Sequence, residues 1–347
     1  MQDILISDST LRDGSHAMKH QFTEEHIANY ARGAEKAGIK VVYVGHGNGL
    51  GASSLQLGMS LLSDIKMLEV ARKELKKTKL GAFLIPGFGT IKNDLEPAIE
   101  SGIEALQVAS HCTEANVTRQ HIQYARNKGL DTYGVLMMSH MVSAKELLEQ
   151  ALKMQEYGAM GVILMDSAGA YLPEDVAEKV KTLVDGLEID VGFHPHNNLG
   201  MATINAITAV KEGAKIIDGT AKGLGAGAGN CQLEVVVAVL HKMGIQTGLD
   251  LYAMMDNCEN IISKIMQKPI EINAITLTSG IAGVFSGFAP HAEKAAKRFN
   301  VDVRDILMEL GKRKVVAGQE DIIVDVAISI KKKKEGKTTD FLLESLT

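Results

Sequence analysis

The stretch that decides the fold is VILMDSAGAYLPEDVAEKVKTLVDGLEIDVGFHPHN, residues 162–197. Two short apolar runs, at 162–167 and 190–197, enclose a longer segment at 173–184 whose apolar residues recur at helical spacing. A strand followed by a helix and a second strand is typical of a parallel β-sheet, because parallel strands need a crossover connection. This unit predicts an α/β protein.

The same alternation recurs along most of the 347 residues. Runs typical of strands lie at 4–8, 41–46, 80–86, 105–111, 132–139, 162–167, 190–197 and 216–223. Helical periodicity lies at 23–37, 63–76, 114–128, 143–157, 173–184, 199–212 and 231–242. Each strand-helix unit takes roughly 30 residues, as expected for βαβ geometry. Eight units favour a closed (β/α)8 TIM barrel, with an open doubly wound sheet as the alternative.

The strand-helix rhythm stops near residue 245, which divides the chain into three parts. We assign residues 1–245 to the catalytic barrel and residues 246–330 to a helical C-terminal extension that we expect to contact a partner or a second copy. Residues 331–347 begin with four lysines and predict a flexible, solvated tail.

Composition narrows the class of protein. Lys and Arg number 37 against 42 Asp and Glu, a net charge of −5, which argues against a nucleic-acid-binding protein. The N-terminal residues lack the pattern of a secretory signal, and no apolar run is long enough to span a membrane. Three cysteines at irregular spacing do not form a disulfide framework. We therefore expect a cytoplasmic protein.

Polar residues gather where the predicted strands end, which is where barrel enzymes place their reactive groups. Arg12, Asp13 and His16 follow the first strand, and His194 and His196 end the seventh. Alternation along a strand points both histidines the same way, so that with Asp13 they could hold Mn²⁺, Mg²⁺, Zn²⁺ or Fe²⁺ with open coordination sites. The alternative is that Asp13 caps a short helix and the histidines are hydrogen-bonded rim residues.

Two glycine-rich loops flank these groups. Residues 223–230 could approach an anionic ligand with their backbone amides or close the barrel rim, and Asn230 could reach the metal. Residues 45–54 predict a mobile loop at the barrel mouth, in which the role of His46 stays open.

Seven segments together resemble the metal-dependent 4-hydroxy-2-oxovalerate aldolases, within the superfamily that also contains hydroxymethylglutaryl-CoA lyase and isopropylmalate synthase. The resemblance covers nearly the whole chain. Its carriers are TLRDGSHA (10–17), HCTEANV (111–117), LMMSHM (136–141), HPHNN (194–198), GAGAGN (225–230), HAEKAA (291–296) and GQEDIIVDVA (318–327).

The resemblance implies a class II type aldolase of aromatic hydrocarbon catabolism, which cleaves a 4-hydroxy-2-keto acid to pyruvate and an aldehyde or runs the reverse addition. It implies Mn²⁺ at Asp13, His194 and His196, with Mg²⁺, Co²⁺ or Zn²⁺ as other candidates. It also implies that Arg12 stabilises the pyruvate enolate and His16 acts as the base. Ser167 would bind the keto-acid end of the substrate.

The chain departs from the family pattern at three positions. Phe285, a substrate-contacting position, stands where the family usually has tyrosine, and Tyr43 and Asn48 stand where it usually has acidic residues. These changes leave the aldehyde and the stereochemistry open. The alternatives are an acyl-CoA-using condensing enzyme or lyase of the same superfamily, and a non-catalytic metal-binding barrel subunit.

The resemblance also implies a partner, because family members often work with an acylating aldehyde dehydrogenase that receives the volatile aldehyde. The C-terminal helices would form that contact. A homo-oligomer formed through the same helices is the alternative.

Overall fold

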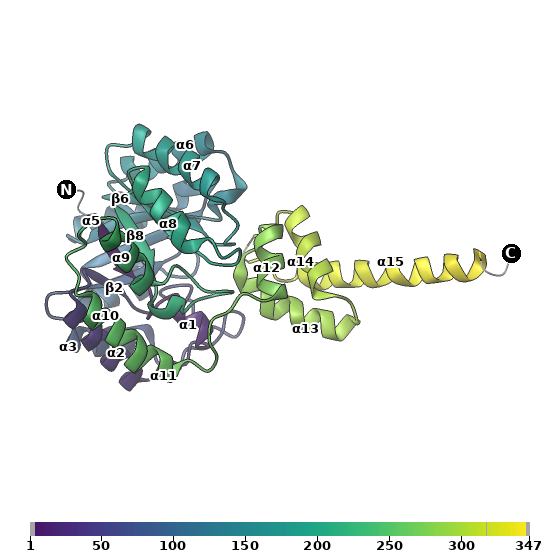
Figure 1. Ribbon diagram of the computed structural model, residues 1–347, viewed down its shortest axis with the longest axis horizontal. Helices are drawn as coiled ribbons and strands as arrows, with labels where there is room; N and C mark the ends of the chain where they lie inside the picture. The colour runs from purple at the N-terminus through teal and green to yellow at the C-terminus, as the bar shows by residue number, and fades with distance from the viewer. Residues whose placement is uncertain (1–3, 317, 345–347) are drawn as a thin grey trace.

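The molecule has a barrel and a helical extension, described here from a computed structural model that covers residues 4–316 and 318–344. Figure 1 shows the extension at one end of the barrel, with the last helix directed away from it. Within the described residues, eight parallel strands close in sequence order, β1 to β8, with Leu5 of β1 paired to Ile216 of β8. The predicted (β/α)8 barrel is confirmed, and the open sheet is excluded.

The strands are short and almost wholly buried. They are β1 Leu5–Asp8, β2 Val41–Tyr43, β3 Lys79–Leu84, β4 Ala105–His111, β5 Asp131–Met137, β6 Gly161–Asp166, β7 Asp190–Pro195 and β8 Ile216–Gly219. The second and eighth end three and four residues earlier than predicted, so that His46 lies on a loop.

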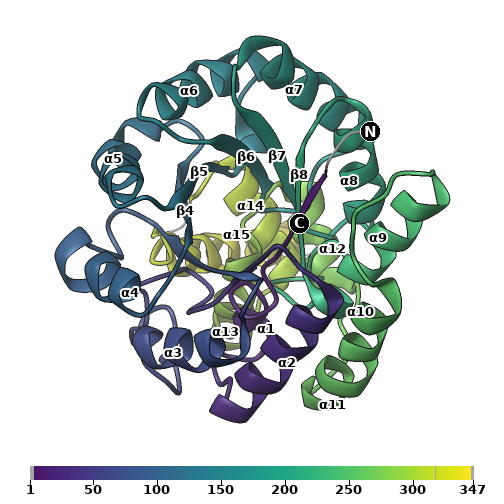
Figure 2. The ribbon, with the colours of Figure 1, turned by 90° about the vertical axis from the view of Figure 1, so that its left-hand side faces the viewer.

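Helices surround the strands, as the view along the barrel in Figure 2 shows. They are α1 Gly14–Ala17, α2 Glu24–Ala37, α3 Asp64–Glu74, α4 Glu96–Glu100, α5 Arg119–Asn127, α6 Ala144–Glu156, α7 Pro173–Gly186, α8 Ala202–Lys211, α9 Leu233–Lys242, α10 Leu251–Asn257 and α11 Ser263–Ile265. Short π or 3-10 turns are η1 Ile91–Leu95, η2 Ala115–Thr118, η3 Ser139–Met141, η4 Ala221–Gly223, η5 Cys258–Ile262 and η6 Ser286–Phe288. The sequence prediction contained no helix between β3 and β4, where the structure has η1 and α4.

Local chemistry explains where the helices begin. Thr23 and Ser143 accept hydrogen bonds from the backbones of His26 and Glu146, which form capping boxes at the starts of α2 and α6. Such a cap stabilises a helix start by about 1 kcal/mol. Gly38 ends α2 in the left-handed conformation that glycine adopts without a steric cost.

The barrel body ends later than the predicted boundary at residue 245. Helix α10 packs against α2, and Asn257 donates a hydrogen bond to the carbonyl of Tyr30 at 3.2 Å. Cys258 and Ile262 belong to the main hydrophobic core between strands and helices. Residues 251–262 therefore belong to the barrel and not to the extension.

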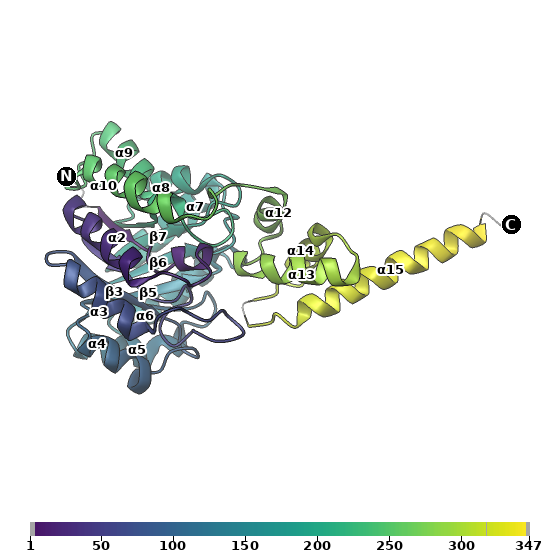
Figure 3. The same ribbon diagram turned by 90° about the horizontal axis from the view of Figure 1, so that it is seen from below.

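The extension has a hydrophobic core of its own, which includes Val284, Phe288, Ile306 and Val326. It is built from α12 Ala274–Ala282, α13 Ala289–Phe299, α14 Val303–Lys312 and α15 Ile322–Glu344. Figure 3 shows α15 continuing beyond α13 and α14. Residues 331–344, predicted as a flexible tail, are helical; residues 345–347 lie outside the described part of the chain. No helix among the described residues is long and apolar enough to cross a membrane.

Candidate metal centre and active site

A carboxylate and two imidazoles meet at the mouth of the barrel. His194 lies near the end of β7 and His196 directly follows that strand. The turn after β1 brings Asp13 opposite them and is held by a hydrogen bond from Asp13 N to the carbonyl of Ser9. Asp13 Oδ2 lies 3.2 Å from His194 Nε2 and 3.5 Å from His196 Nε2. One potential ligand atom from each residue lies within 4.8 Å of the others, and all three residues are buried. This donor set fits a divalent transition-metal ion and leaves further coordination positions open.

The protonation states suit metal binding. Burial raises the pKa of Asp13, but the Arg12 guanidinium and the two imidazoles outweigh it and hold that pKa well below its usual range. Burial lowers the pKa of His196 to about 4, so its imidazole is neutral near pH 7. An ionised carboxylate and a neutral imidazole are the forms that bind metals.

His194 is oriented from behind by a third carboxylate. Its Nδ1 lies 2.9 Å from Asp218 Oδ2, which directs Nε2 toward Asp13. Asp218 also accepts hydrogen bonds from Ser7 Oγ and from Gln107 Nε2, the latter at 3.1 Å. Burial lowers the pKa of His194, but the hydrogen bonds with Asp13 and Asp218 raise it overall. A carboxylate behind a ligating histidine fixes the ring orientation and strengthens the ligand.

Asn230 contacts the metal cluster through Asp13. Its Nδ2 donates to Asp13 Oδ2 at 2.6 Å. Its buried Oδ1 has no hydrogen-bond partner among the residues that the structure describes. A buried amide oxygen without a partner is costly, which makes this oxygen available to a bound ligand.

Arg12 lies beside the cluster with two of its three guanidinium nitrogens unpaired within the described chain. Nη1 donates to the carbonyl of Gly47 at 3.3 Å and lies 3.7 Å from Asp13 Oδ1, and the guanidinium lies over the Phe83 ring at 4.4 Å. Nε and Nη2 are buried without a partner in the described part of the chain. Two unpaired guanidinium donors are suited to a carboxylate or an enolate oxygen.

His16 faces the same space from α1. Its Nε2 lies 3.9 Å from Asp13 Oδ1. Burial lowers the pKa of His16, which keeps the imidazole neutral and able to accept a proton. The structure thus brings Arg12, Asp13, His16, His194 and His196 together.

Ser167 and Phe285 lie at the junction with the extension. Ser167 Oγ accepts a hydrogen bond from the backbone N of Met138 at 3.0 Å. The Phe285 ring packs edge-on against Phe288, with centroids 5.8 Å apart. Phe285 therefore belongs to the core of the extension, while Ser167 lies on the barrel side.

Asn198 joins this junction to the site. Two residues beyond His196, its Nδ2 donates to Ser286 Oγ and to the carbonyl of Ala168, both at 2.8 Å. Its Oδ1 accepts from the backbone N of Ala228 in the glycine-rich loop at 2.9 Å. A single buried amide therefore connects the extension with two loops of the barrel mouth.

Tyr43 and Asn48 are the two other positions at which the chain departs from the family pattern. Tyr43 is buried inside the barrel, where burial raises its pKa well above the usual range. The backbone N of Asn48 donates to His46 Nδ1 at 3.0 Å.

The sequence prediction missed Asp218 and Gly47. Asp218 is separated from its partner Gln107 by 111 residues and from its partner His194 by 24 residues. Nothing in the sequence around Asp218 indicates these two contacts. The signal available was its place in an otherwise apolar strand, because a carboxylate in such a strand needs a partner.

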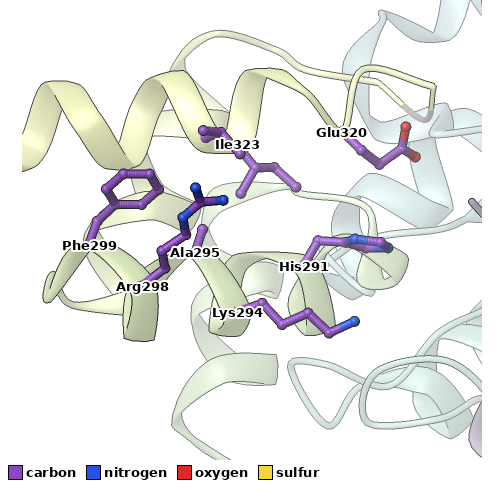
Figure 4. A pocket seen from close by; sticks show the side chains of 8 residues that line it. His291, Lys294, Ala295, Arg298, Phe299, Glu320 and Ile323 are labelled. Carbon is purple, nitrogen blue, oxygen red and sulfur yellow. The ribbon is translucent and has the colours of Figure 1, made fainter.

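A separate cavity of about 200 Å³ lies on the extension between α13 and the start of α15. Figure 4 shows His291, Lys294 and Arg298 extending from α13, with Glu320 and Ile323 on the facing segment. Glu320 accepts a hydrogen bond from Gln56 of the β2–α3 loop at 3.2 Å. The cavity is distant in sequence from the metal cluster and lies on the domain predicted to contact a partner.

A closed barrel with a buried Asp-His-His group, a guanidinium and a neutral imidazole at the carboxyl ends of its strands defines a (β/α)8-barrel enzyme. The chain belongs to the HMGL-like family, whose model matches residues 3–261. Residues 270–332 match the DmpG-like communication domain.

Relatives over nearly the full length narrow the class. A protein of Pectobacterium atrosepticum named 4-hydroxy-2-oxovalerate aldolase is 54% identical over 332 residues, which are 96% of this chain and 97% of the relative. Proteins of the same name from Salinispora arenicola and Spirochaeta aurantia are 53% and 50% identical, covering 94% of this chain and 93% and 96% of their own lengths. The chain belongs to this aldolase family and is a carbon-carbon lyase.

Solved structures support the fold. The carboxyl transferase domain of Rhizobium etli pyruvate carboxylase aligns with a TM-score of 0.80 at 15% identity. The alignment covers 96% of this chain and 61% of that one. At this level of identity the likeness concerns the architecture alone.

Proposed function

We propose that this lyase is a divalent-metal-dependent, class II type aldolase that cleaves a 4-hydroxy-2-keto acid to pyruvate and an aldehyde, or runs the reverse addition. The observation that carries the proposal is the buried cluster of Asp13, His194 and His196 with two unpaired donors of Arg12 beside it. The names of the full-length relatives support the substrate class.

Each side chain has a distinct task in this proposal. His16 takes the proton of the 4-hydroxyl, and the 4-oxygen then forms the aldehyde carbonyl as the bond between C3 and C4 breaks. The electron pair of that bond forms the C2=C3 double bond, the π pair of the keto group moves onto the C2 oxygen to give the enolate, and the aldehyde leaves. Arg12 binds the developing enolate oxygen, and Ser167 binds the carboxylate end. Protonation of the enolate methylene gives pyruvate.

Asp13, His194 and His196 would hold the ion, for which we propose Mn²⁺, with Mg²⁺, Co²⁺ and Zn²⁺ as the other candidates. When bound, a divalent ion polarises the keto group and stabilises the negative charge that develops on its oxygen. Burial of the cluster excludes water, which strengthens the electrostatic contribution of Arg12.

We propose further that the extension binds an acylating aldehyde dehydrogenase that receives the aldehyde. The match to a communication domain supports this assignment. So does the cavity lined by His291, Lys294 and Arg298, which is suited to an acidic surface segment. The enzyme would then work in a hetero-oligomer in the cytoplasm, where the three free cysteines stay reduced.

Proton NMR in D₂O tests the aldolase proposal without requiring the aldehyde. With enzyme and Mn²⁺ the methyl signal of pyruvate should fade, and a chelator should stop the exchange. Asp13→Ala should abolish it with an unchanged circular dichroism spectrum, whereas Asp185→Ala, a surface aspartate on α7, should behave as wild type. Exchange that continues in Asp13→Ala or with the chelator would contradict the proposal.

A further inference from the structure

The loop between β2 and α3 places one residue, Gly47, against both reactive side chains. Arg12 Nη1 donates to the carbonyl of Gly47 at 3.3 Å, and the His16 ring packs closely against Gly47. One residue of the loop thus contacts both groups.

The contact between Gly47 and His16 leaves no room for a side chain. A Cβ atom at position 47 would lie 2.4 Å from His16 Nε2 and 2.5 Å from its Cδ2. Gly47 does not have a positive φ, so an alanine there would be compatible with the backbone. The three atoms nearest to such a Cβ all belong to the His16 ring.

The buried His46 side chain connects two parts of the β2–α3 loop. It is fully buried, its Nδ1 accepts from the backbone N of Asn48 at 3.0 Å, and its Nε2 donates to the carbonyl of Gly58 at 3.1 Å. Its own backbone N donates to Asp64 Oδ1 at 3.4 Å. The two ring bonds use one donor and one acceptor, which is the bonding capacity of a neutral imidazole.

A second histidine supports the ring. His20 stacks on His46 with centroids 3.7 Å apart and an interplanar angle of 14°. His20 Nδ1 in turn lies 3.2 Å from Ser15 Oγ, next to His16 in the chain. The loop is therefore connected to helix α1 through His20 as well as through Gly47.

We propose that His46 is a positioning residue for the reaction: it fixes Gly47, whose carbonyl accepts from the Arg12 guanidinium and whose backbone packs against the His16 imidazole. The inference rests on the proposed function, in which Arg12 binds the enolate and His16 takes the proton. Displacing a reactive group by about 1 Å can cost on the order of 10²-fold in rate.

A double-mutant cycle tests the contact between Gly47 and His16. Gly47→Ala should lower the midpoint of thermal unfolding and reduce pyruvate methyl exchange by on the order of 10²-fold. In a His16→Ala background the same glycine change should leave the unfolding midpoint almost unaltered, because the ring that it meets is gone. Equal losses of stability in both backgrounds would overturn the inference.

Substitution of His46 tests the positioning role itself. His46→Ala should reduce kcat by on the order of 10²-fold while the Kd for Mn²⁺ stays unchanged, since the ligand residues are untouched. His46→Gln, whose amide nitrogen can reach the Gly58 carbonyl, should recover part of the rate. His241→Asn is the matched control, because that histidine hydrogen-bonds to Thr247 away from the site.

Other outcomes are also decisive. Wild-type kcat in His46→Ala, or a parallel loss of kcat and Mn²⁺ affinity, would overturn the positioning role. Failure of the proposed function is separate, because wild-type enzyme would then show no Mn²⁺-dependent exchange, while the unfolding midpoints would still report on the contact between Gly47 and His16.

Discussion

Asp218 illustrates how one residue can control a site that it does not enter. It lies behind His194 with its carboxylate 2.9 Å from Nδ1, and Ser7 and Gln107 hold it in place. The side chain cannot itself reach the substrate side of the imidazole. Its contribution is to fix which ring nitrogen carries the proton and which faces Asp13.

Asp218→Asn should therefore weaken Mn²⁺ binding by about 10- to 100-fold, as for other residues behind metal-ligating histidines. The amide keeps the size of the carboxylate but removes the charge that favours the Nδ1–H form of His194. Titration with Mn²⁺ followed by electron paramagnetic resonance gives the Kd without an activity measurement. Asp185→Ala is the surface control. An unchanged Kd for Mn²⁺ in Asp218→Asn would show that Asp218 contributes only to packing.

The sequence was informative about residues whose role follows from strand alternation. His194 and His196 were predicted to point the same way because they are two residues apart on a strand. Asp13 was predicted to lie near them because it follows the end of another strand. Asp218 and Gly47 were not found, because their roles depend on contacts across the barrel and between loops. Tyr43 was noted as unusual, but its position inside the barrel became visible only with the register of β2 and β3.

At the scale of elements, a single glutamate joins α2 to the turn before β3. The Glu35 carboxylate accepts hydrogen bonds from the backbone N atoms of Lys76, Lys77 and Thr78 at 2.9–3.0 Å. Burial raises the pKa of Glu35, but these three bonds outweigh it and lower that pKa to about 2. The bonds attach the turn that follows α3 to helix α2.

Glu35→Gln should lower the free energy of unfolding at pH 7 by about 1 kcal/mol, a value reduced for the screening of an exposed charge. Because the folded-state pKa is below the ordinary value of 4.5, this stabilisation is present above pH 4.5 and is lost as the pH falls toward 2. Urea unfolding of both proteins between pH 7 and pH 3 measures the difference. A difference that grows on acidification would contradict this explanation.

The elements themselves were largely predictable, since alternating apolar runs and helical periodicity reflect burial in the barrel. The seven predicted barrel helices differ from α2, α3 and α5 to α9 by a few residues at their ends. Helix α4 was missed because it is only five residues long and follows an irregular turn. Helix α10 was assigned to the wrong part of the chain, because packing against α2 leaves no mark in its own periodicity.

On the scale of the whole molecule, the extension carries a row of basic groups on a surface without a function in the barrel chemistry. His291, Lys294 and Arg298 lie one turn or two turns apart on α13 beside the cavity. Charges at the rim of an interface act chiefly on the association rate and on its salt dependence.

Lys294→Glu together with Arg298→Glu should therefore slow binding of the proposed dehydrogenase partner by about 10-fold at low salt and make the rate less sensitive to salt. Surface plasmon resonance at two salt concentrations measures both effects. Lys181→Glu on α7 is the matched control on the barrel surface. If the double variant bound the partner at the wild-type rate, the partner would bind another surface. Aldolase turnover should be unchanged in either case.

The hydrogen bonds of Asn198 have a consequence for exchanging parts between related enzymes. Because this buried amide binds Ser286 of the extension and the backbones of Ala168 and Ala228, the two parts of the chain are not interchangeable modules. A chimera whose crossover point lies in the barrel-extension linker at 266–273 would keep its own Asn198 but receive a foreign residue at position 286. Recombination should succeed only between parents that both have a hydroxyl side chain at position 286. The need for this one hydroxyl limits which extensions a given barrel can acquire, and therefore which partners.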